Sequence, residues 1–235
     1  MPTTRGLLLA FTRCNSAARA AEWEGWYDEQ HLPDLVRDGG PWVATRWRIP
    51  DAPVPGRPSI GFTHAAIYEL DAPDLDAAAR RLLARDRALR RRGRVHPAHC
   101  VLGVELLRAH GRWSERPPPS DALRGQILAW VMCNQPEREA EWDAWYDAQH
   151  APDMLESGAF SAVTRWERHR RSAFGPQHLT LYDVSERSVA EAVELSFAVM
   201  PRIHASGRWL DCHAGGMALT LEPAGRHGAA GYRRP

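Results

Sequence analysis

The feature that most constrains the fold of this chain is an internal repeat. When the 235-residue sequence is shifted by 119 positions, the stretch that begins at Gly6 aligns with the stretch that begins at Gly125. Between Glu22–Arg48 and Glu141–Glu167, 13 of 27 positions are identical. A repeat of about a hundred residues indicates two copies of one small domain in one polypeptide.

The copies differ mainly in one loop and in what joins them. His64-x-x-x-Tyr68 matches His178-x-x-x-Tyr182 at a shift of 114, so the first copy carries extra residues, in the Pro-rich loop PDAPVPGRP. Consecutive prolines at Pro117–Pro119 fit neither a helix nor a central strand and indicate a linker. We therefore predict a first repeat at residues 1–112, a linker at 113–124, a second repeat at 125–224, and a disordered C-terminal tail at 225–235.

Each copy shows the same order of expected elements. Apolar runs predict strands at residues 7–12, 43–49, 63–70 and 100–108, and at 126–132, 162–167, 179–184 and 217–222. Helical spacing predicts helices at 20–37 and 75–92, and at 139–156 and 188–199. This is a β-α-β-β-α-β unit, so the predicted class is α+β with two tandem ferredoxin-like repeats. One such unit leaves a sheet face bare, and two copies can bury those faces in an intrachain barrel.

Composition excludes several classes of function. The formal net charge is +1, which favours neither nucleic acid nor an anionic membrane as a partner. The chain has no apolar run near the roughly 20 residues that span a bilayer, and its apolar N-terminal run is too short for a secretory signal. Four cysteines do not make a disulfide framework in a chain of this length. We therefore expect a cytoplasmic protein without a membrane partner.

The first helix of each copy holds the motif E-W-x-x-W-Y-D-x-Q-H-x-P-D, at Glu22–Asp34 and again at Glu141–Asp153. At 3.6 residues per turn, Trp23, Tyr27 and His31 share one stripe of the helix. The proline two residues after the histidine lacks a backbone donor, so the helix should kink or end near His31. A kink there opens space beside the imidazole.

These residues suggest acid–base chemistry, because an imidazole titrates nearest to neutral pH and neighbouring acids can fix its tautomer. The candidate catalytic residues, each present in both copies, are His31, His150, Asp28, Asp147, Asp34 and Asp153. A buried core histidine is the alternative for His31 and His150. Asp34 and Asp153 could instead cap the helix segment that begins at the proline.

The motif W-Y-D-x-x-H-x-P-D after a short strand resembles the EthD-like family of the dimeric α/β barrel superfamily. The resemblance covers most of both repeats and is weaker in the second half of each. It implies cofactor-free isomerases, cyclases, decarboxylases, dehydratases or quinone-forming monooxygenases, while other branches of the superfamily bind haem. A fold of this kind transfers well between relatives and a function transfers poorly.

In that superfamily the ligand usually lies between the sheet and the helices, which implies a set of wall residues here. From the first copy the substrate-binding candidates are Trp26, Tyr27, Asn15, Arg46, Trp47, His64 and Tyr68. From the second they are Trp145, Tyr146, Asn134, Arg165, Trp166, His178 and Tyr182. With ten tryptophans in the chain, such a wall suits a flat, largely apolar ligand. Arg46 and Arg165 would neutralise an anionic group of that ligand, or alternatively pair with Asp28 and Asp147.

The leading hypothesis is a small cofactor-independent isomerase or lyase that moves protons on an aromatic or polyketide-like molecule, with a histidine as general acid or base. No phosphate-binding loop, dinucleotide fingerprint or Cys/His zinc spacing occurs, so we expect neither a metal nor a bound cofactor. A haem protein or cofactor-free monooxygenase is the second hypothesis, and a non-catalytic binding protein is the third. Fusion of the copies predicts a monomer, with further dimerisation optional.

Overall fold

The computed structural model describes residues 4–36, 43–50, 61–112 and 122–228. The chain forms two compact units. Unit 1 comprises residues 4–109 together with 223–228, and unit 2 comprises residues 110–222. Most of the predicted linker, most of the Pro-rich loop and the last seven residues of the predicted tail lie outside the described residues.

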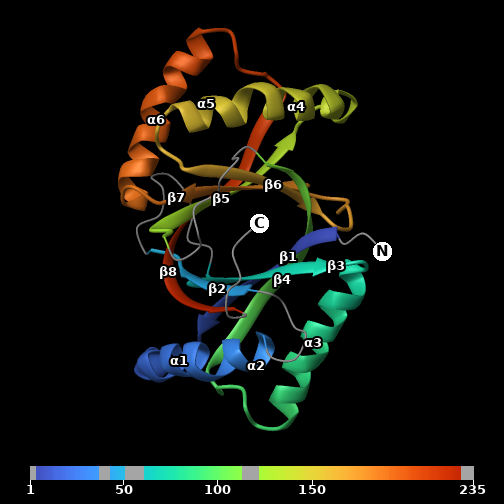
Figure 1. Ribbon diagram of the computed structural model, residues 1–235, viewed down its shortest axis with the longest axis vertical. Helices are drawn as coiled ribbons and strands as arrows, with labels where there is room; N and C mark the ends of the chain where they lie inside the picture. The colour runs from blue at the N-terminus through green and yellow to red at the C-terminus, as the bar shows by residue number, and fades with distance from the viewer. Residues whose placement is uncertain (1–3, 37–42, 51–60, 113–121, 229–235) are drawn as a thin grey trace. The chain divides into compact units, whose positions relative to one another are not determined.

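Unit 1 follows the expected β-α-β-β-α-β order (Figure 1). Its strands are β1 (Thr4–Cys14), β2 (Val43–Arg48), β3 (His64–Ala72) and β4 (His99–Arg112). Its helices are α1 (Ala20–Trp26), α2 (Leu32–Val36) and α3 (Leu75–Arg91), with a 3-10 turn at Ala17–Arg19 and a π-helical turn at Tyr27–His31.

Unit 2 repeats this order. Its strands are β5 (Gly125–Cys133), β6 (Ala162–Arg168), β7 (His178–Val184) and β8 (His213–Gly228). Its helices are α4 (Glu139–Trp145), α5 (Ala151–Glu156) and α6 (Val189–Ala205), with a 3-10 turn at Pro136–Arg138 and a π-helical turn at Tyr146–His150. The predicted α+β class and the predicted element order are therefore confirmed in both units.

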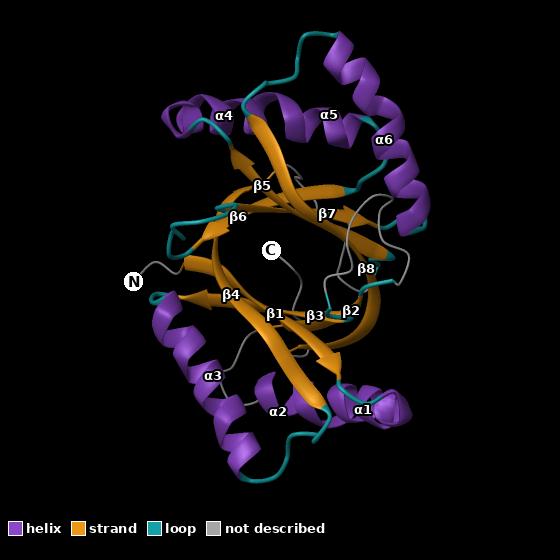
Figure 2. Cartoon of the chain, turned by 180° about the vertical axis from the view of Figure 1, so that it is seen from behind, coloured by secondary structure: helices purple, strands orange, loops and turns teal. Residues whose placement is uncertain are grey.

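Each unit has an antiparallel sheet with the same strand order. In unit 1, β1 pairs with β4 and β3, and β3 pairs with β2. In unit 2, β5 pairs with β8 and β7, and β7 pairs with β6. The helices of each unit cover one face of its own sheet (Figure 2), where the aromatic residues of the motif pack on alternate strand residues such as Tyr68 and Tyr182.

The first strand of each unit carries a glycine where the second helix crosses it closely. A Cβ on Gly6 would lie 2.8 Å from Leu75 Cδ2 and 2.9 Å from the Leu107 carbonyl oxygen. A Cβ on Gly125 would overlap Val189 and lie 2.7 Å from the Leu221 carbonyl oxygen. Only a residue without a side chain lets α3 and α6 begin this near to the sheet.

The motif helix continues past its proline with one irregular turn. Each copy switches to π-helical geometry for one turn, at Tyr27–His31 and at Tyr146–His150, and then continues as an α-helix. Pro33 and Pro152 have no backbone N–H, so each interrupts the series of backbone hydrogen bonds that holds the helix together. A π turn just before the proline is a common way to accommodate this interruption. The predicted alternative of a helix end near the histidine is therefore wrong, and the irregularity observed there is a π turn.

Two predicted ends were too short. Helix α6 runs past the predicted residue 199 and through Pro201, with Ile203 buried near its end. Strand β8 reaches Gly228, so residues 225–228 of the predicted disordered tail are part of a strand. Gly225, in the part of β8 that belongs to unit 1, lies directly against the Asp28 carboxylate, an approach that a Cβ would prevent. No helix among the described residues is both long enough and apolar enough to cross a membrane.

Candidate functional site

The motif residues of each copy form a buried aromatic cluster between the first helix and the sheet. Trp23 and Tyr27 are each 1% exposed and His31 is 4% exposed. The His31 imidazole stacks on Trp26 with ring centroids 4.6 Å apart, and the edge of Tyr27 lies 4.9 Å away. In the second copy His150 stacks on Trp145 at 5.1 Å and meets Tyr146 at 4.7 Å. We call these the motif clusters.

A second histidine joins each motif cluster from the last strand. The Trp23 indole nitrogen donates to His99 Nδ1 at 3.2 Å, and the Trp142 indole nitrogen donates to His213 Nδ1 at 3.0 Å. The rings of His31 and His99 are 5.3 Å apart. Sequence reasoning missed this pair, although His99 and His213 are separated by 114 residues, the same shift that matched His64 with His178.

In unit 2 a chain of hydroxyl groups leads to the motif histidine. The Thr180 hydroxyl donates to the Tyr146 hydroxyl at 2.9 Å, which lies 2.7 Å from the Tyr182 hydroxyl. The Tyr182 hydroxyl lies 3.4 Å from His150 Nε2. In unit 1 Ala66 occupies the position of Thr180, and a carboxylate from α3 lies near His31 instead, with Asp86 Oδ1 4.0 Å from Nε2. Asp86 is a residue that the sequence did not point to.

Both motif histidines have a nitrogen without a partner. Among the described residues, no group hydrogen-bonds to Nδ1 of His31 or to Nδ1 of His150, and both atoms are buried. Burial, with the nearby His99 and Arg90, lowers the pKa of His31 to about 3. Burial, with His213 and Arg165, likewise lowers the pKa of His150 to about 3. Desolvation disfavours the charged ring, so burial favours the neutral form of both imidazoles near physiological pH.

The expected acid partners of these histidines are engaged elsewhere. Asp28 accepts two hydrogen bonds from the Arg46 guanidinium, at 2.9 and 2.7 Å. Asp147 contacts Arg165, which is fully buried. Each guanidinium also lies over the adjacent tyrosine ring, at 5.0 Å for Arg46 and Tyr27. The alternative interpretation of Arg46 and Arg165 as salt-bridge partners is the one observed.

The contacts of Asp34 and Asp153 match neither of the two roles predicted for them. Asp34 accepts two hydrogen bonds from Arg94, at 2.9 and 2.7 Å, and Asp153 pairs with Arg208. Both arginines follow the second helix of their unit. These aspartates therefore join the motif helix to that loop and neither orient the histidine nor cap a helix.

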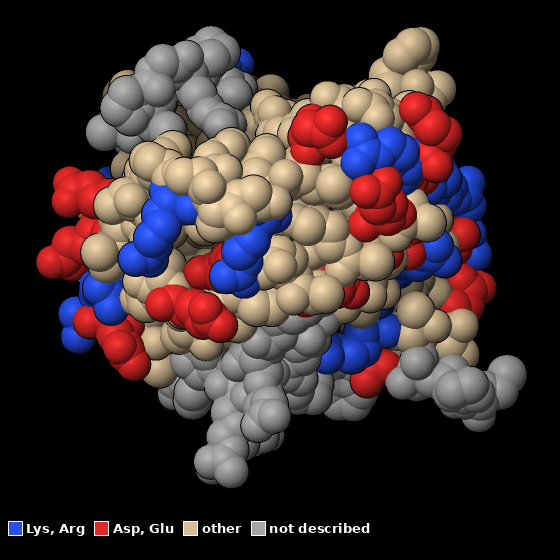
Figure 3. All heavy atoms as spheres, turned by 90° about the horizontal axis from the view of Figure 1, so that it is seen from above, with Lys and Arg blue, Asp and Glu red and all other residues tan. Residues whose placement is uncertain are grey.

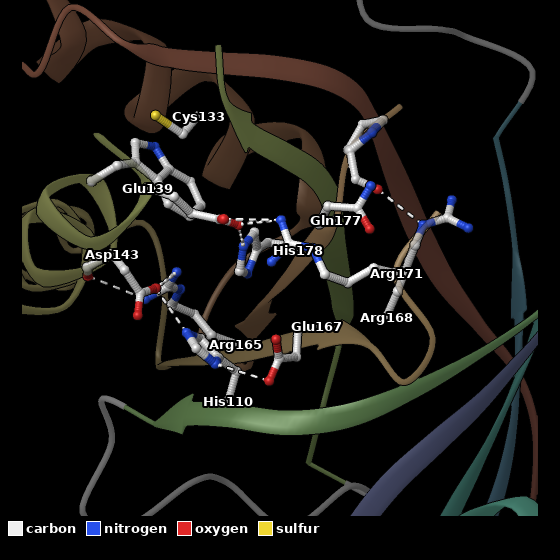
Figure 4. A network of polar contacts seen from close by, with 12 residues as sticks. His110, Cys133, Glu139, Asp143, Arg165, Glu167, Arg168, Arg171, Gln177 and His178 are labelled. Atoms are coloured by element: carbon white, nitrogen blue, oxygen red, sulfur yellow. Dashed lines mark hydrogen bonds and ion pairs between the residues drawn. The ribbon is translucent and has the colours of Figure 1, made fainter. Parts of the chain in front are cut away.

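A second polar network lies beside the motif cluster of unit 2 (Figure 4). His110 Nε2 is 2.7 Å from Asp143 Oδ1, and His178 Nε2 is 3.2 Å from Glu139 Oε1. Burial alone would raise the pKa of Asp143, but the hydrogen bond from His110 and the charge of Arg165 lower it to about 2. The hydrogen bond to Asp143 raises the pKa of His110.

Some predicted wall residues do not reach the motif clusters. Asn15 and Asn134 are exposed, and Asn15 accepts a hydrogen bond from Arg13. Trp47 and Trp166 are buried, but they alternate with Arg46 and Arg165 along their strands and so face away from the helices. The other predicted wall residues lie in the motif clusters or in the polar groups next to them: Trp26, Tyr27, Arg46, His64, Tyr68, Trp145, Tyr146, Arg165, His178 and Tyr182.

The charge distribution on the surface does not mark a binding site. On the face drawn in Figure 3, acidic and basic side chains are interspersed among uncharged ones. No broad area of one sign stands out among the described residues visible there. The buried clusters are therefore the candidates for the functional site.

No family model and no curated protein matches the chain. Several solved structures do match the chain. A protein from Fusobacterium nucleatum, provisionally named a monooxygenase, matches 100% of this chain and 99% of its own at 10% identity and a TM-score of 0.59. An anthrone oxidase-like protein matches 97% of this chain and 94% of its own at 13% identity and a TM-score of 0.57. A protein provisionally named a chlorite dismutase matches 95% of this chain and 97% of its own at 12% identity and a TM-score of 0.60.

Identities this low establish the fold alone. The mixed α+β chain has the fold of dimeric α/β barrel proteins of the monooxygenase and chlorite dismutase type. The activities in those names belong to those proteins.

Proposed function

We propose that this chain is an enzyme that moves a proton on an acidic, flat aromatic or polyketide-like molecule, and that His31 and His150 are its acid–base residues. The observation that carries the proposal is the same in both copies. A buried neutral imidazole has Nε2 near a polar group and leaves Nδ1 without a hydrogen-bond partner among the described residues. A buried polar atom that stays unpaired costs free energy, so its presence in both copies favours a role with a ligand.

The hydroxyl chain of unit 2 suggests which form of the imidazole acts. If each hydroxyl donates to the next, Thr180 donates to Tyr146, Tyr146 to Tyr182, and Tyr182 to His150 Nε2. That order leaves the proton of the neutral ring on Nδ1. A neutral imidazole N–H can donate to an oxygen that gains negative charge as a substrate becomes an enolate or phenolate. In this tautomer the imidazole is the hydrogen-bond donor, and the proton that leaves the substrate carbon passes to water.

A second candidate function begins with the same step. An aromatic carbanion or enolate can react directly with O2, and an anthrone oxidase-like protein shares this fold. The oxygenation would convert the CH2 group of an anthrone to a carbonyl, with one O2 consumed and one water released. Proton removal without oxygenation and proton removal followed by oxygenation are therefore separable by experiment.

We also propose that both repeats are ferredoxin-like units of the EthD-like type. The motif supports this, because its two copies occupy equivalent helices in units with the same strand order. In both, the Asp of W-Y-D pairs with the arginine of the following strand.

Haem fits the motif clusters less well than a smaller flat ligand does, because both need space beside the histidine and the macrocycle needs more of it. An axial imidazole would need a flat cavity beside it for the macrocycle. The rings of Trp26, Tyr27 and His99 pack around His31, with centroids 4.6, 4.9 and 5.3 Å away, so a macrocycle would have to displace all three. We therefore propose chemistry that needs no haem, and a Soret band of a histidine-ligated haem in the purified protein would contradict it.

The test uses 1,8-dihydroxyanthrone as the probe. Without oxygen, exchange of its CH2 protons with D2O, followed by NMR, measures proton transfer alone. In air, O2 uptake and formation of the quinone measure oxygenation. We expect the wild-type chain to accelerate exchange, and the double variant His31→Ala/His150→Ala to lower that rate by roughly 10²–10⁴-fold.

The control is Phe174→Ala, which removes an aromatic side chain that is 87% exposed and should leave the exchange rate unchanged. Circular dichroism checks the folding of every variant. A wild-type rate equal to that of buffer, or a folded double variant as fast as the wild type, would show the proposal to be wrong. Exchange without O2 uptake would reject the second candidate only.

A further inference from the structure

Three side chains with metal-binding groups meet in unit 2, outside the motif cluster. His110 lies near the end of β4, Asp143 lies in α4, and His178 begins β7. One ligand atom from each lies within 4.8 Å of the other two. Figure 4 shows these residues converging from separate elements. No part of the proton-transfer proposal uses His110 or Asp143.

The spacing is close to that of a bound ion. Zinc binds histidine nitrogen and carboxylate oxygen at about 2.0–2.2 Å, so two ligand atoms on one ion lie roughly 3–4 Å apart. His110 Nε2 and Asp143 Oδ1 are already 2.7 Å apart. His178 is fixed, with its side chain 5% exposed, whereas the side chains of His110 and Asp143 are 21% and 31% exposed and have room to move. Small rotations of those two side chains would bring all three ligand atoms within bonding distance of one ion.

Both imidazoles already have the outer partner that metal-binding histidines have. Glu167 Oε1 is 3.4 Å from His110 Nδ1, and Glu139 Oε1 is 3.2 Å from His178 Nε2. That leaves His110 Nε2 and His178 Nδ1 for an ion, and His178 Nδ1 is buried with no hydrogen-bond partner among the described residues. A carboxylate on the far nitrogen fixes the tautomer of the ring and raises its basicity as a ligand.

The local charge also favours a cation. The contacts of this network join four carboxylates to two guanidiniums, Arg165 and Arg171. The carboxylates belong to Glu139, Asp143, Asp147 and Glu167. Arg165 and His110 both contact Oδ1 of Asp143, so an ion would either bind Oδ2 of that carboxylate or replace one of these contacts at Oδ1.

The first repeat lacks most of this arrangement. His64 and Glu24 correspond to His178 and Asp143, and they contact each other at 3.0 Å. Ala20 stands at the position of Glu139, and Arg48 at the position of Glu167. His99 lies opposite Cys14 in the sheet, and His213 lies opposite Cys133, so His99 and His213 are equivalent positions of the two repeats. His110 follows His99 by eleven residues, and the residue that follows His213 by eleven is Ala224. The second imidazole and both outer carboxylates therefore occur in unit 2 alone.

We propose that His110, His178 and Asp143 form a binding site for one divalent transition-metal ion, with Zn²⁺ as the best match. Two imidazoles and a carboxylate suit zinc and its neighbours better than Mg²⁺ or Ca²⁺, which prefer oxygen ligands alone. Three protein ligands leave a fourth position for water, as in zinc sites that act on bound ligands. This site is independent of the proton-transfer proposal.

The test uses the full chain after treatment with a chelator. Co²⁺ is added first, because its visible absorption reports the ligand set, and Zn²⁺ is then titrated to displace it. We expect one equivalent of Zn²⁺ per chain. His110→Ala and His178→Ala should each weaken binding at least about tenfold, and Glu167→Gln should weaken it about 10–100-fold through the outer partner.

His64→Ala is the matched control, because it removes the equivalent histidine of unit 1 and should bind Zn²⁺ as the wild type does. His110 is partly exposed, so its variant is expected to fold even if His178→Ala does not. Absence of a Co²⁺ band in the wild type would overturn the proposal. So would equal binding by the wild type and His110→Ala, which would mean that the metal binds elsewhere on the chain.

Discussion

At the scale of single residues, the buried histidines decide how the protein responds to pH. Burial lowers the pKa of His31 and His150 to about 3 and of His99 and His213 to about 4, from 6.5. Below pH 6.5 the unfolded chain takes up protons at these positions, while the folded chain does not. The free energy of unfolding should therefore fall as the pH falls, by up to about 1.4 kcal/mol per pH unit for each histidine.

Urea unfolding between pH 7.5 and 5 measures this effect, in a range above the ordinary pKa of carboxyl groups. The variant His31→Phe/His150→Phe should show a shallower pH dependence than the wild type. Equal slopes for the two proteins would mean that these imidazoles titrate alike in the folded and unfolded chains.

The residue scale also shows where sequence reasoning ended. Spacing on a helix placed His31 beside Trp26 and Tyr27 correctly, because neighbours three to five residues apart share a face. It could not reveal that Arg46 would bind Asp28, or that Asp86 would lie near His31, since those contacts join separate elements. It gave no sign of His110 beside Asp143 either, because the first repeat has no equivalent histidine.

At the scale of elements, the close crossing of α6 over β5 is the most sensitive packing feature. Gly125→Ala would place a methyl group against Val189 and 2.7 Å from the Leu221 carbonyl oxygen, which belongs to the backbone and cannot move aside. We expect a loss of about 1–3 kcal/mol in the free energy of unfolding. Gly215→Ala is the control, because a Cβ at Gly215 in β8 meets nothing within 4 Å. Equal stability of the two variants in urea would contradict this account.

Element boundaries were predictable where periodicity was strong and less so near prolines. The helix at 75–92 was predicted within one residue of α3, which has a capping aspartate, Asp74, that accepts a hydrogen bond from the Ala77 N–H. The prediction ended α6 six residues early, because Pro201 is normally a stop signal. The π turns were not predicted, because each adds one residue to a single turn and a segment this short does not show the shift as a change of period.

At the scale of the whole molecule, the repeat itself leads to a prediction. Two copies in one chain can supply what single-copy relatives obtain by dimerisation, so we predict a folded monomer of 26.4 kDa. Light scattering over a range of concentrations measures the mass, with circular dichroism to report folding. A chain that is folded only as a dimer would show that fusion does not replace the second copy.

The central claim is that each motif histidine is neutral at physiological pH and keeps one nitrogen for a ligand. NMR of protein with ¹⁵N-labelled histidine tests it most directly, with the His150 signals assigned from their loss in His150→Ala. We predict that His150 shows the shifts of a neutral ring from pH 8 to pH 5, with the proton on Nδ1. A titration of His150 with a midpoint near 6.5, its ordinary value, would contradict the account.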